Sequence, residues 1–167
     1  MSAVYREDRD RVDALLAAGV EPDAFEAAAL GDSGRLRLLL DDSAERATAW
    51  SPDGFTALHL AAYFGHRDAA LLLLQRGADV RAVSRNEIGV TPLQSAVSAG
   101  EGEVAALLLE RGADPNAREQ GGFTPLHAAA QNGDEALARL LLRRGADPEA
   151  EADDGRRPRD FGLGGLL

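Results

Sequence analysis

Histidines are the first residues of this sequence to examine for chemistry. His59, His66 and His127 are its only histidines, and no other side chain ordinarily titrates near neutral pH. An enzyme that uses general acid–base catalysis would draw on them first. A zinc site would need ligands at i and i+4 of one helix or converging from loops, and His66 with Asp68 makes only one weak, adjacent pair. We therefore expect neither catalytic residues nor a metal site.

Two other patterns could be mistaken for chemical sites. The carboxylate pairs Asp41 with Asp42 and Asp153 with Asp154 could form catalytic dyads, but they fall at a predicted helix end and in a predicted loop. Solvated acids are common in such places. The glycines at 162, 164 and 165 could suggest a phosphate-binding loop, but no strand precedes them and no lysine follows. We expect no cofactor, and we expect a flexible tail at the C-terminus.

Composition and charge narrow the classes of protein further. Of 167 residues, 45% are hydrophobic and 28% charged, which is typical of one globular domain. The absence of cysteine excludes disulfides, thiolate zinc sites and a cysteine nucleophile. A formal net charge of -10 repels phosphate backbones and anionic lipids, so we expect neither nucleic acid nor membrane as a partner. No apolar run is long enough to span a bilayer, and residues 1–10 do not resemble a signal peptide, which predicts a cytoplasmic protein.

An internal repeat defines the elements that would position these residues. A five-residue pattern recurs at spacings of 35 and 33 residues, beginning at Phe55, Val90 and Phe123. It reads Phe-Thr-Ala-Leu-His, Val-Thr-Pro-Leu-Gln and Phe-Thr-Pro-Leu-His. In each copy one glycine follows nine residues after the Thr and another follows twelve residues later: Gly65 and Gly77, Gly100 and Gly112, Gly133 and Gly145. Three landmarks that recur three times indicate a repeat protein.

Each landmark has a local structural meaning. The Thr supplies a side-chain oxygen for unpaired backbone amides, and a Pro after it loses nothing because the first amide of a helix has no partner. A short helix therefore begins after each Thr, and the first glycine permits a tight turn into a second helix. Each second helix carries two leucines shortly before its closing glycine, which gives every copy the same apolar stripe. These are Leu73 and Leu74, Leu108 and Leu109, and Leu141 and Leu142.

The sequence Thr-Pro-Leu-His-Ala-Ala, the glycine nine residues after its Thr, and the closing Leu-Leu-x-x-Gly-Ala-Asp resemble the ankyrin repeat. The resemblance is strong over residues 47–160. It implies an all-α solenoid of stacked helix-turn-helix units with hairpin fingers. It also implies a structural hydrogen bond for His59 and His127. Residues 23–47 resemble a degenerate first repeat in which Asp23 caps the first helix.

The repeat register predicts the organisation of the whole chain. An N-terminal capping helix occupies 1–20, ankyrin repeats occupy 21–152, and a truncated C-terminal cap repeat with a tail occupies 153–167. The repeats divide into a degenerate first copy at 21–50 and three full copies at 51–86, 87–119 and 120–152. The copies depart from the family pattern at three positions, where Ala57 replaces Pro, Gln94 replaces His, and Arg157 replaces the capping Thr.

One of the predicted fingers is longer than the next. The loop from Gly77 to Thr91 spans 14 residues, whereas the corresponding loop of the next copy spans 12. The two additional residues fall near Asn86 and Glu87. In the ankyrin family this stretch is the finger, so the insertion should lengthen one finger without disturbing the helices.

The resemblance also implies a function in protein recognition. Stacked repeats of this kind present an extended concave face made of fingers and first helices. We expect a monomer that binds an unidentified protein partner through this face, as an adaptor, an inhibitor or a scaffold. The candidate partner-binding residues, carried over by position, are Trp50, Asp53, Phe55, Tyr63, Phe64, Asn86, Glu87, Ile88, Ser98, Gln120, Gln131 and Asn132.

Aromatic residues gather at one end of this predicted face. Trp50, Phe55, Tyr63 and Phe64 are four of the eight aromatic residues and fall within 15 positions. Such clustering favours a binding hot spot, but a structural alternative stays open in which Phe64 packs under its neighbour and Trp50 fills a gap in the first repeat. Two other functions also stay open. A structural cap or subunit of a larger assembly would need an apolar open end, and an enzyme would need a convergent titratable cluster.

Overall fold

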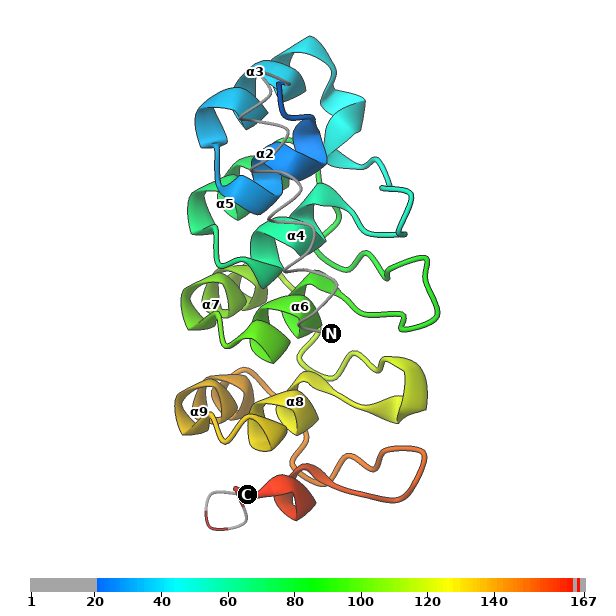
Figure 1. Ribbon diagram of the computed structural model, residues 1–167. Helices are drawn as coiled ribbons and strands as arrows, with labels where there is room; N and C mark the ends of the chain where they lie inside the picture. Colours follow the sequence, from blue (N-terminus) through cyan, green and yellow to red (C-terminus); the bar gives the residue numbers. More distant parts are fainter. Residues whose placement is uncertain (1–20, 164, 166–167) are drawn as a thin grey trace.

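Paired helices stacked along one axis make up the fold (Figure 1). This computed structural model describes residues 21–163 and 165, so the capping helix predicted at 1–20 lies outside the described residues. The described helix pairs are α2 (Ala24–Leu30) with α3 (Ser33–Asp42), α4 (Ala57–Tyr63) with α5 (Arg67–Gln75), α6 (Pro92–Ala99) with α7 (Gly102–Glu110), and α8 (Pro125–Gln131) with α9 (Glu135–Arg143). Short 3-10 turns follow at η1 (Ala44–Ala47), η2 (Gln120–Gly122) and η3 (Pro158–Phe161). The predicted all-α solenoid is therefore confirmed.

The degenerate first repeat begins where the sequence predicted. The Oδ1 of Asp23 accepts hydrogen bonds from the amides of Phe25 and Glu26 at 2.8 and 2.9 Å. In return, the carboxylate of Glu26 accepts a hydrogen bond from the amide of Asp23 at 2.9 Å. This reciprocal cap satisfies amides that would otherwise lack a partner at the start of α2. Gly31 then ends the helix with a positive φ of 72°, and α3 follows.

The turn between α4 and α5 shows why the repeat needs glycine at this point. Gly65 has a φ of 75°, a conformation that side chains with a Cβ rarely adopt. A Cβ at this position would also collide with the carboxylate of Glu101 from the next repeat. The positive φ therefore makes glycine the suitable residue at this turn, and the flexible end of the Glu101 side chain can move aside.

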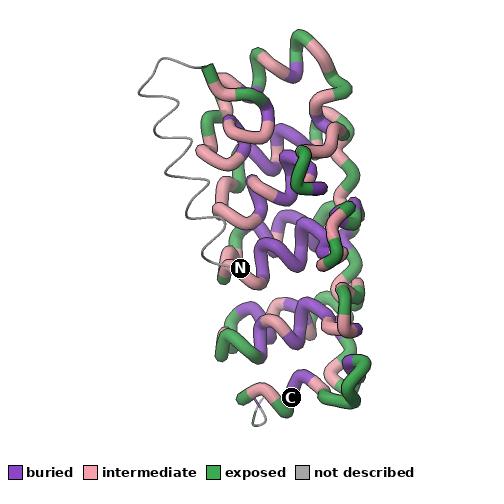
Figure 2. Tube along the Cα trace, turned by 45° about the vertical axis from the view of Figure 1, so that its right-hand side comes forward, coloured by how far each residue is buried: buried purple, intermediate pink, exposed green. Residues whose placement is uncertain are grey.

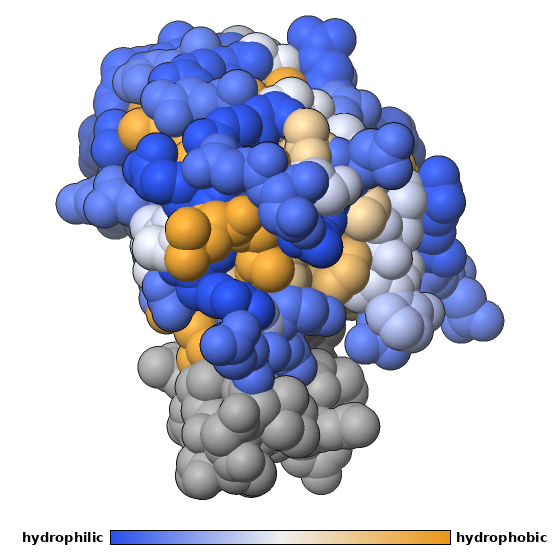
Figure 3. All heavy atoms as spheres, turned by 90° about the horizontal axis from the view of Figure 1, so that it is seen from above, coloured by the Kyte–Doolittle hydropathy of each residue, from blue (hydrophilic) through white to orange (hydrophobic). Residues whose placement is uncertain are grey.

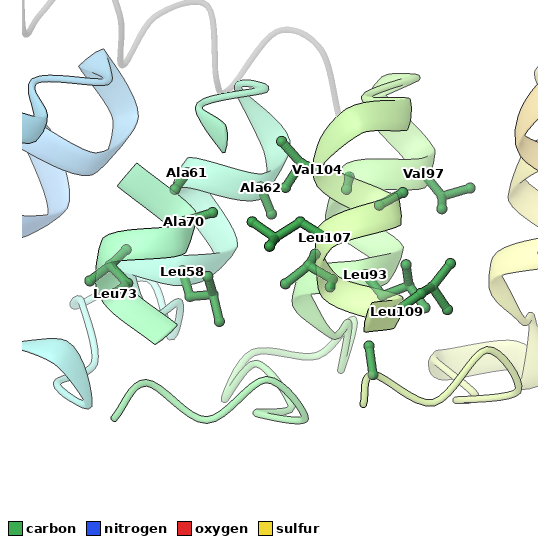
Figure 4. Packing of buried hydrophobic residues seen from close by; sticks show 14 of the residues in the cluster. Leu58, Ala61, Ala62, Ala70, Leu73, Leu93, Val97, Val104, Leu107 and Leu109 are labelled. Atoms are coloured by element: carbon green, nitrogen blue, oxygen red, sulfur yellow. The ribbon is translucent and has the colours of Figure 1, made fainter. Parts of the chain in front are cut away.

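One continuous hydrophobic core runs along the stack. Apolar side chains from both helices of each pair meet those of the adjacent pairs, and Figure 4 shows this packing among α4, α5, α6 and α7. Figure 2 shows buried segments in the helices of each successive pair, while many of the exposed segments lie on the loops. Fully buried leucines at matching positions of successive repeats are Leu58, Leu93 and Leu126 on the first helices and Leu73, Leu108 and Leu141 on the second.

The connections between helix pairs project to one side of the stack as fingers (Figure 1). Single backbone hydrogen bonds join successive fingers: Arg85 N to Gly54 O at 2.8 Å, Gln120 N to Ile88 O at 2.9 Å, and Asp153 N to Gly121 O at 2.8 Å. The two inserted residues lie in the finger before α6, and α6 and α7 still form a complete pair. The fingers therefore make one connected edge along the stack.

The C-terminal end is packed against the last helix pair. The turn η3 contacts α8, and the side chain of Leu163 is buried in the core. The sequence predicted a flexible tail from Gly162 onward. Instead, the side chain of Leu163 belongs to the hydrophobic core, so the chain is packed at least as far as this residue. Among the described residues, no helix is both long enough and apolar enough to cross a membrane.

Candidate functional site

His59 links its own repeat to the next one. Its Nδ1 accepts a hydrogen bond from the amide of Thr56 at 3.1 Å, and its Nε2 lies 3.0 Å from the carbonyl oxygen of Val90. Because Nδ1 accepts, the neutral ring must carry its proton on Nε2 and donate it to Val90. The side chain is 1% exposed, and burial lowers the pKa of His59 to about 4. The imidazole is therefore neutral at pH 7 and serves as a bridge between repeats.

The same link recurs at the matching position of the other copies. His127 Nδ1 accepts the amide of its capping Thr at 3.1 Å, and its Nε2 lies 3.1 Å from the carbonyl oxygen of Arg156. At the matching position of the middle copy, the side-chain oxygen of Gln94 accepts a hydrogen bond from the amide of Thr91 at 2.8 Å. The side-chain nitrogen of Gln94 donates to the carbonyl oxygens of Ala117 and Phe123 at 3.2 and 3.3 Å. The structural role that the resemblance implied for the two histidines is confirmed, and glutamine performs it equally.

The remaining candidates for chemistry also have structural partners. Nε2 of His66 lies 3.0 Å from the carbonyl oxygen of Ala29 in the preceding repeat. Each aspartate of the two predicted carboxylate pairs is bonded to its own arginine: Asp41 to Arg76, Asp42 to Arg46, Asp153 to Arg118 and Asp154 to Arg156. Within the part of the chain that the structure describes, no three His, Cys, Asp or Glu residues are placed to hold a metal ion.

The predicted binding residues at the ends of the first helices share one register along the stack. Tyr63 ends α4 and Ser98 lies in the last turn of α6, whereas Gln131 ends α8. Because α4 packs on α6 and α6 packs on α8, these positions follow one another on successive repeats. The rings of Tyr63 and Phe64 contact each other edge to face at 5.3 Å, and both side chains are half-buried. One end of this strip is therefore aromatic.

The other end of the same strip is polar. Gln131 and Asn132 are exposed at the end of α8. The side-chain amide of Asn132 donates to the carbonyl oxygens of Val97 and Ser98, each at 3.2 Å. Asn132 thus joins two repeats, and Gln131 beside it faces solvent.

The predicted finger residues form a second group on the connected edge. Asp53, Glu87 and Gln120 are exposed at successive finger tips, and Ile88 and Asn86 are half-buried behind them. The backbone bonds between fingers hold these tips in order along the stack. The structure thus brings the twelve candidates together as two sets, one on the helix ends and one on the fingers.

Trp50 and Phe55 pack around the buried histidine of their repeat. Their ring centroids lie 6.2 and 5.8 Å from that of His59. The guanidinium carbon of Arg85, in the next finger, lies 4.3 Å from the Trp50 ring centroid. Trp50 therefore supports the fold and also holds an exposed arginine in place.

Two exposed apolar residues did not appear among the sequence candidates. Leu38 of α3 is 65% exposed, and Val83 is 54% exposed in the second finger, which is the connection between α5 and α6. Among the residues described, these are the only large hydrophobic residues so exposed. Figure 3 looks along the stack from its α2 and α3 end and shows apolar residues grouped among hydrophilic ones. For Val83, the alternation of Arg81, Ala82, Val83, Ser84 and Arg85 was the signal that could have located it.

Comparison with known proteins supplies one match. A family model described as ankyrin repeats, in three copies, matches residues 1–84 and 83–152. All four described helix pairs lie within the matched residues. No curated protein matches the chain.

Proposed function

Because the chain belongs to the ankyrin-repeat family, whose repeats are generally protein-interaction modules, we propose that it binds a partner protein through its concave face. This face is formed by the ends of the first helices and by the fingers. The protein would act without catalysis and as a monomer, in the role of an adaptor, an inhibitor or a scaffold.

A contrast between constant and variable positions carries the proposal. The capping Thr, the Leu of the motif and the His or Gln after it are buried in every full copy and hold the repeats together. The pair before the turn between the helices instead changes from Tyr63 and Phe64 to Ser98 and Ala99 and then to Gln131 and Asn132, and these pairs are half-buried or exposed. Chemical variety on a fixed scaffold is what a recognition surface requires.

The aromatic end of the face is the proposed anchor. Tyr and Trp dominate binding hot spots because a rigid ring buries a large apolar area and keeps a polar group for hydrogen bonding. Tyr63 and Trp50 are both half-buried in the described structure, in the same repeat and the finger that leads to it. A partner that covers this end would remove the remaining exposed ring surface from water.

Affinity capture from an extract of the native cells, followed by mass spectrometry, tests this proposal. The wild-type protein should capture a specific partner, and the variant with both Tyr63→Ala and Phe64→Ala should capture much less of it. Leu38→Ala is the matched control. It also truncates an exposed apolar residue, but this residue lies on α3 and not at the end of α4, where Tyr63 and Phe64 lie. Equal capture by all three proteins would contradict the aromatic helix ends of the concave face as the binding surface.

A structural subunit of a larger assembly is the second candidate function. The observation that favours it is Leu38, which is 65% exposed in α3 at one end of the stack. Association through that end would give an apparent mass above 17.6 kDa in analytical ultracentrifugation. The variant Leu38→Asp would then return the protein to a monomer, whereas a wild-type monomer would exclude self-assembly through this end.

A further inference from the structure

The second finger presents a face of its own. Arg81, Val83 and Arg85 are exposed, and Ala82 and Ser84 between them are buried. This alternation is typical of an extended segment with one side outward. We name these three exposed residues the Arg-Val-Arg face. Val83 is the middle residue of this face in the sequence, between two exposed arginines.

Arg85 is held in position without a carboxylate. Its guanidinium carbon lies 4.3 Å from the Trp50 ring centroid, and its backbone amide donates to the carbonyl of Gly54 at 2.8 Å. Stacking uses the flat face of a guanidinium and leaves the N–H groups in its plane available. No acidic side chain lies within ion-pair distance of Arg85 in the described part of the chain. A fixed guanidinium with unused donors is suited to bind a carboxylate.

Arg81 is fixed in a comparable way. Its Nε donates to the carbonyl oxygen of Gly112 in the next repeat at 2.9 Å. The nearby carboxylate of Asp79 accepts a hydrogen bond from the backbone amide of Arg81 at 2.8 Å. Across residues 21–163, the Arg81 side chain forms no ion pair. Its terminal nitrogens are therefore also available to a ligand.

The matching positions of the later fingers are occupied differently. Gln120 and Asp153 correspond to Arg85, because they donate the same backbone bond between fingers, and Asp153 pairs with Arg118 at 3.1 Å. Asn116 and Glu149 correspond to Arg81; Asn116 is uncharged, and Glu149 pairs with Arg157 and Arg159. Ion pairs thus neutralise these fingers internally. The second finger differs because its cations have no internal counter-ion among the described residues.

The tip of the second finger is ordered by Asn86. Its Oδ1 accepts hydrogen bonds from Ser84 Oγ at 2.9 Å and from the amide of Ile88 at 3.2 Å. Its Nδ2 donates to the carbonyl of Asp53 in the preceding finger at 3.2 Å. These bonds fix the finger before any ligand arrives, which lowers the ordering cost of binding.

We propose that the Arg-Val-Arg face binds an extended acidic segment of a partner protein. One carboxylate contacts Arg81, a second contacts Arg85, and an apolar side chain between them covers Val83. In an extended peptide, side chains two residues apart lie on the same side, which matches the period of two in the exposure of residues 81–85. A segment with the order acidic-x-apolar-x-acidic therefore matches the face. This inference rests on the proposed function, that the chain binds a protein.

Charge favours a short acidic peptide over other anions. Two carboxylates neutralise the two local cations, but a long polyanion would also meet the field of a chain whose net charge is -10. Nucleic acids and anionic membranes carry no apolar side chain to cover Val83. The face is thus best matched by a protein segment.

Trp50 supplies the assay, because it is the only tryptophan of the sequence and stacks on Arg85. A blocked peptide with the sequence Glu-Ser-Val-Ser-Glu is titrated while tryptophan fluorescence and heat are measured. We expect a saturable change that Arg81→Gln weakens about tenfold, because charged hydrogen bonds are strong. Val83→Ser should also weaken binding. Arg37→Gln removes the same charge from an exposed position of α3 and should leave binding unchanged.

Three results would overturn the inference. One is the absence of a fluorescence or heat change at peptide concentrations of about 1 mM. Another is equal weakening by Arg81→Gln and Arg37→Gln, which would reduce the effect to overall charge. The third is that a single-stranded oligonucleotide or phosphatidylserine vesicles bind more tightly than the peptide, and that Arg81→Gln abolishes this tighter binding. A peptide with Gln in place of both Glu residues should not bind.

The proposed function and this inference fail separately. If the peptide does not bind but the Tyr63 and Phe64 variant loses its partner, the inference is wrong and the concave face still binds. If the peptide binds but that variant captures its partner normally, the Arg-Val-Arg face is correct and the helix ends are not the binding surface.

Discussion

Acid should destabilise the fold through His59. The pKa of His59 is about 4 in the folded protein because burial disfavours the charged ring, whereas an unfolded chain has the ordinary value of 6.5. The folded pKa is the lower one, so the unfolded state binds the proton more tightly. Stability is therefore lost as pH falls from about 6.5 to about 4, and is fully present above that window.

The magnitude follows from the two pKa values. At pH 4.5 the unfolded histidine is almost fully protonated and the folded one is mostly neutral, which costs about 2 to 3 kcal/mol. His127 adds a loss in the same direction, because burial lowers its pKa as well. For a small domain whose total stability is about 5 to 15 kcal/mol, this loss is large.

Gln94 shows how to isolate the effect of His59. This glutamine makes the same reciprocal cap and the same link to the next repeat, and it does not titrate. His59→Gln should therefore fold and keep the link. Urea unfolding of both proteins at pH 7 and pH 4.5 gives the comparison, and carboxylate titration cancels between them. We expect the wild type to lose about 2 to 3 kcal/mol more than the variant. Equal losses would refute the assignment of a buried neutral imidazole.

Three further predictions concern the scaffold. Leu141→Ala should destabilise the protein by about 2 to 5 kcal/mol, measured by urea unfolding, because it leaves a cavity in a fully buried position of α9. Deletion of Asn86 and Glu87 should leave the circular dichroism helix signal nearly unchanged, because the change is confined to a finger, and should lower the melting temperature only by the loss of the Asn86 hydrogen bonds. Arg157→Ala should leave the urea midpoint of unfolding nearly unchanged, although it breaks ion pairs with two glutamates, because solvent screens such pairs.

Each of these predictions can fail clearly. A melting curve for Leu141→Ala within a degree or so of the wild type would show that the leucine register is wrong. A large loss of helicity after the deletion would place the inserted residues inside a structural element. A large fall in the urea midpoint of Arg157→Ala would show that the ion pairs hold the C-terminal turn in place.

Local signals in the sequence account for most of the fold. Thr before a helix and Gly between helices act on their immediate neighbours, so their spacing alone located the helix pairs. Asp23 marked the start of a repeat with little other resemblance because its cap depends on the next three residues only. The roles of His59 and His127 came from the family resemblance, and the geometry agrees with it.

The finger surface could not be predicted in the same way. The stacking of Arg85 on Trp50 joins residues 35 positions apart, and it depends on how adjacent fingers lie against each other. Likewise, nothing local distinguishes Arg85 from Arg118, although only Arg118 has an aspartate partner in the described structure. The packing of Leu163 also depends on the end of the stack, where the sequence pattern had already stopped.

The dissociation constant of the purified, identified partner tests the central claim most directly. Calorimetric titration of the wild type, of the Tyr63→Ala and Phe64→Ala double variant, and of the control Leu38→Ala would give three values under the same conditions. We predict at least about tenfold weaker binding for the double variant and no change for the control, because a hot-spot aromatic contributes about 2 kcal/mol or more. An unchanged dissociation constant for a double variant that is still folded would contradict recognition through the concave face.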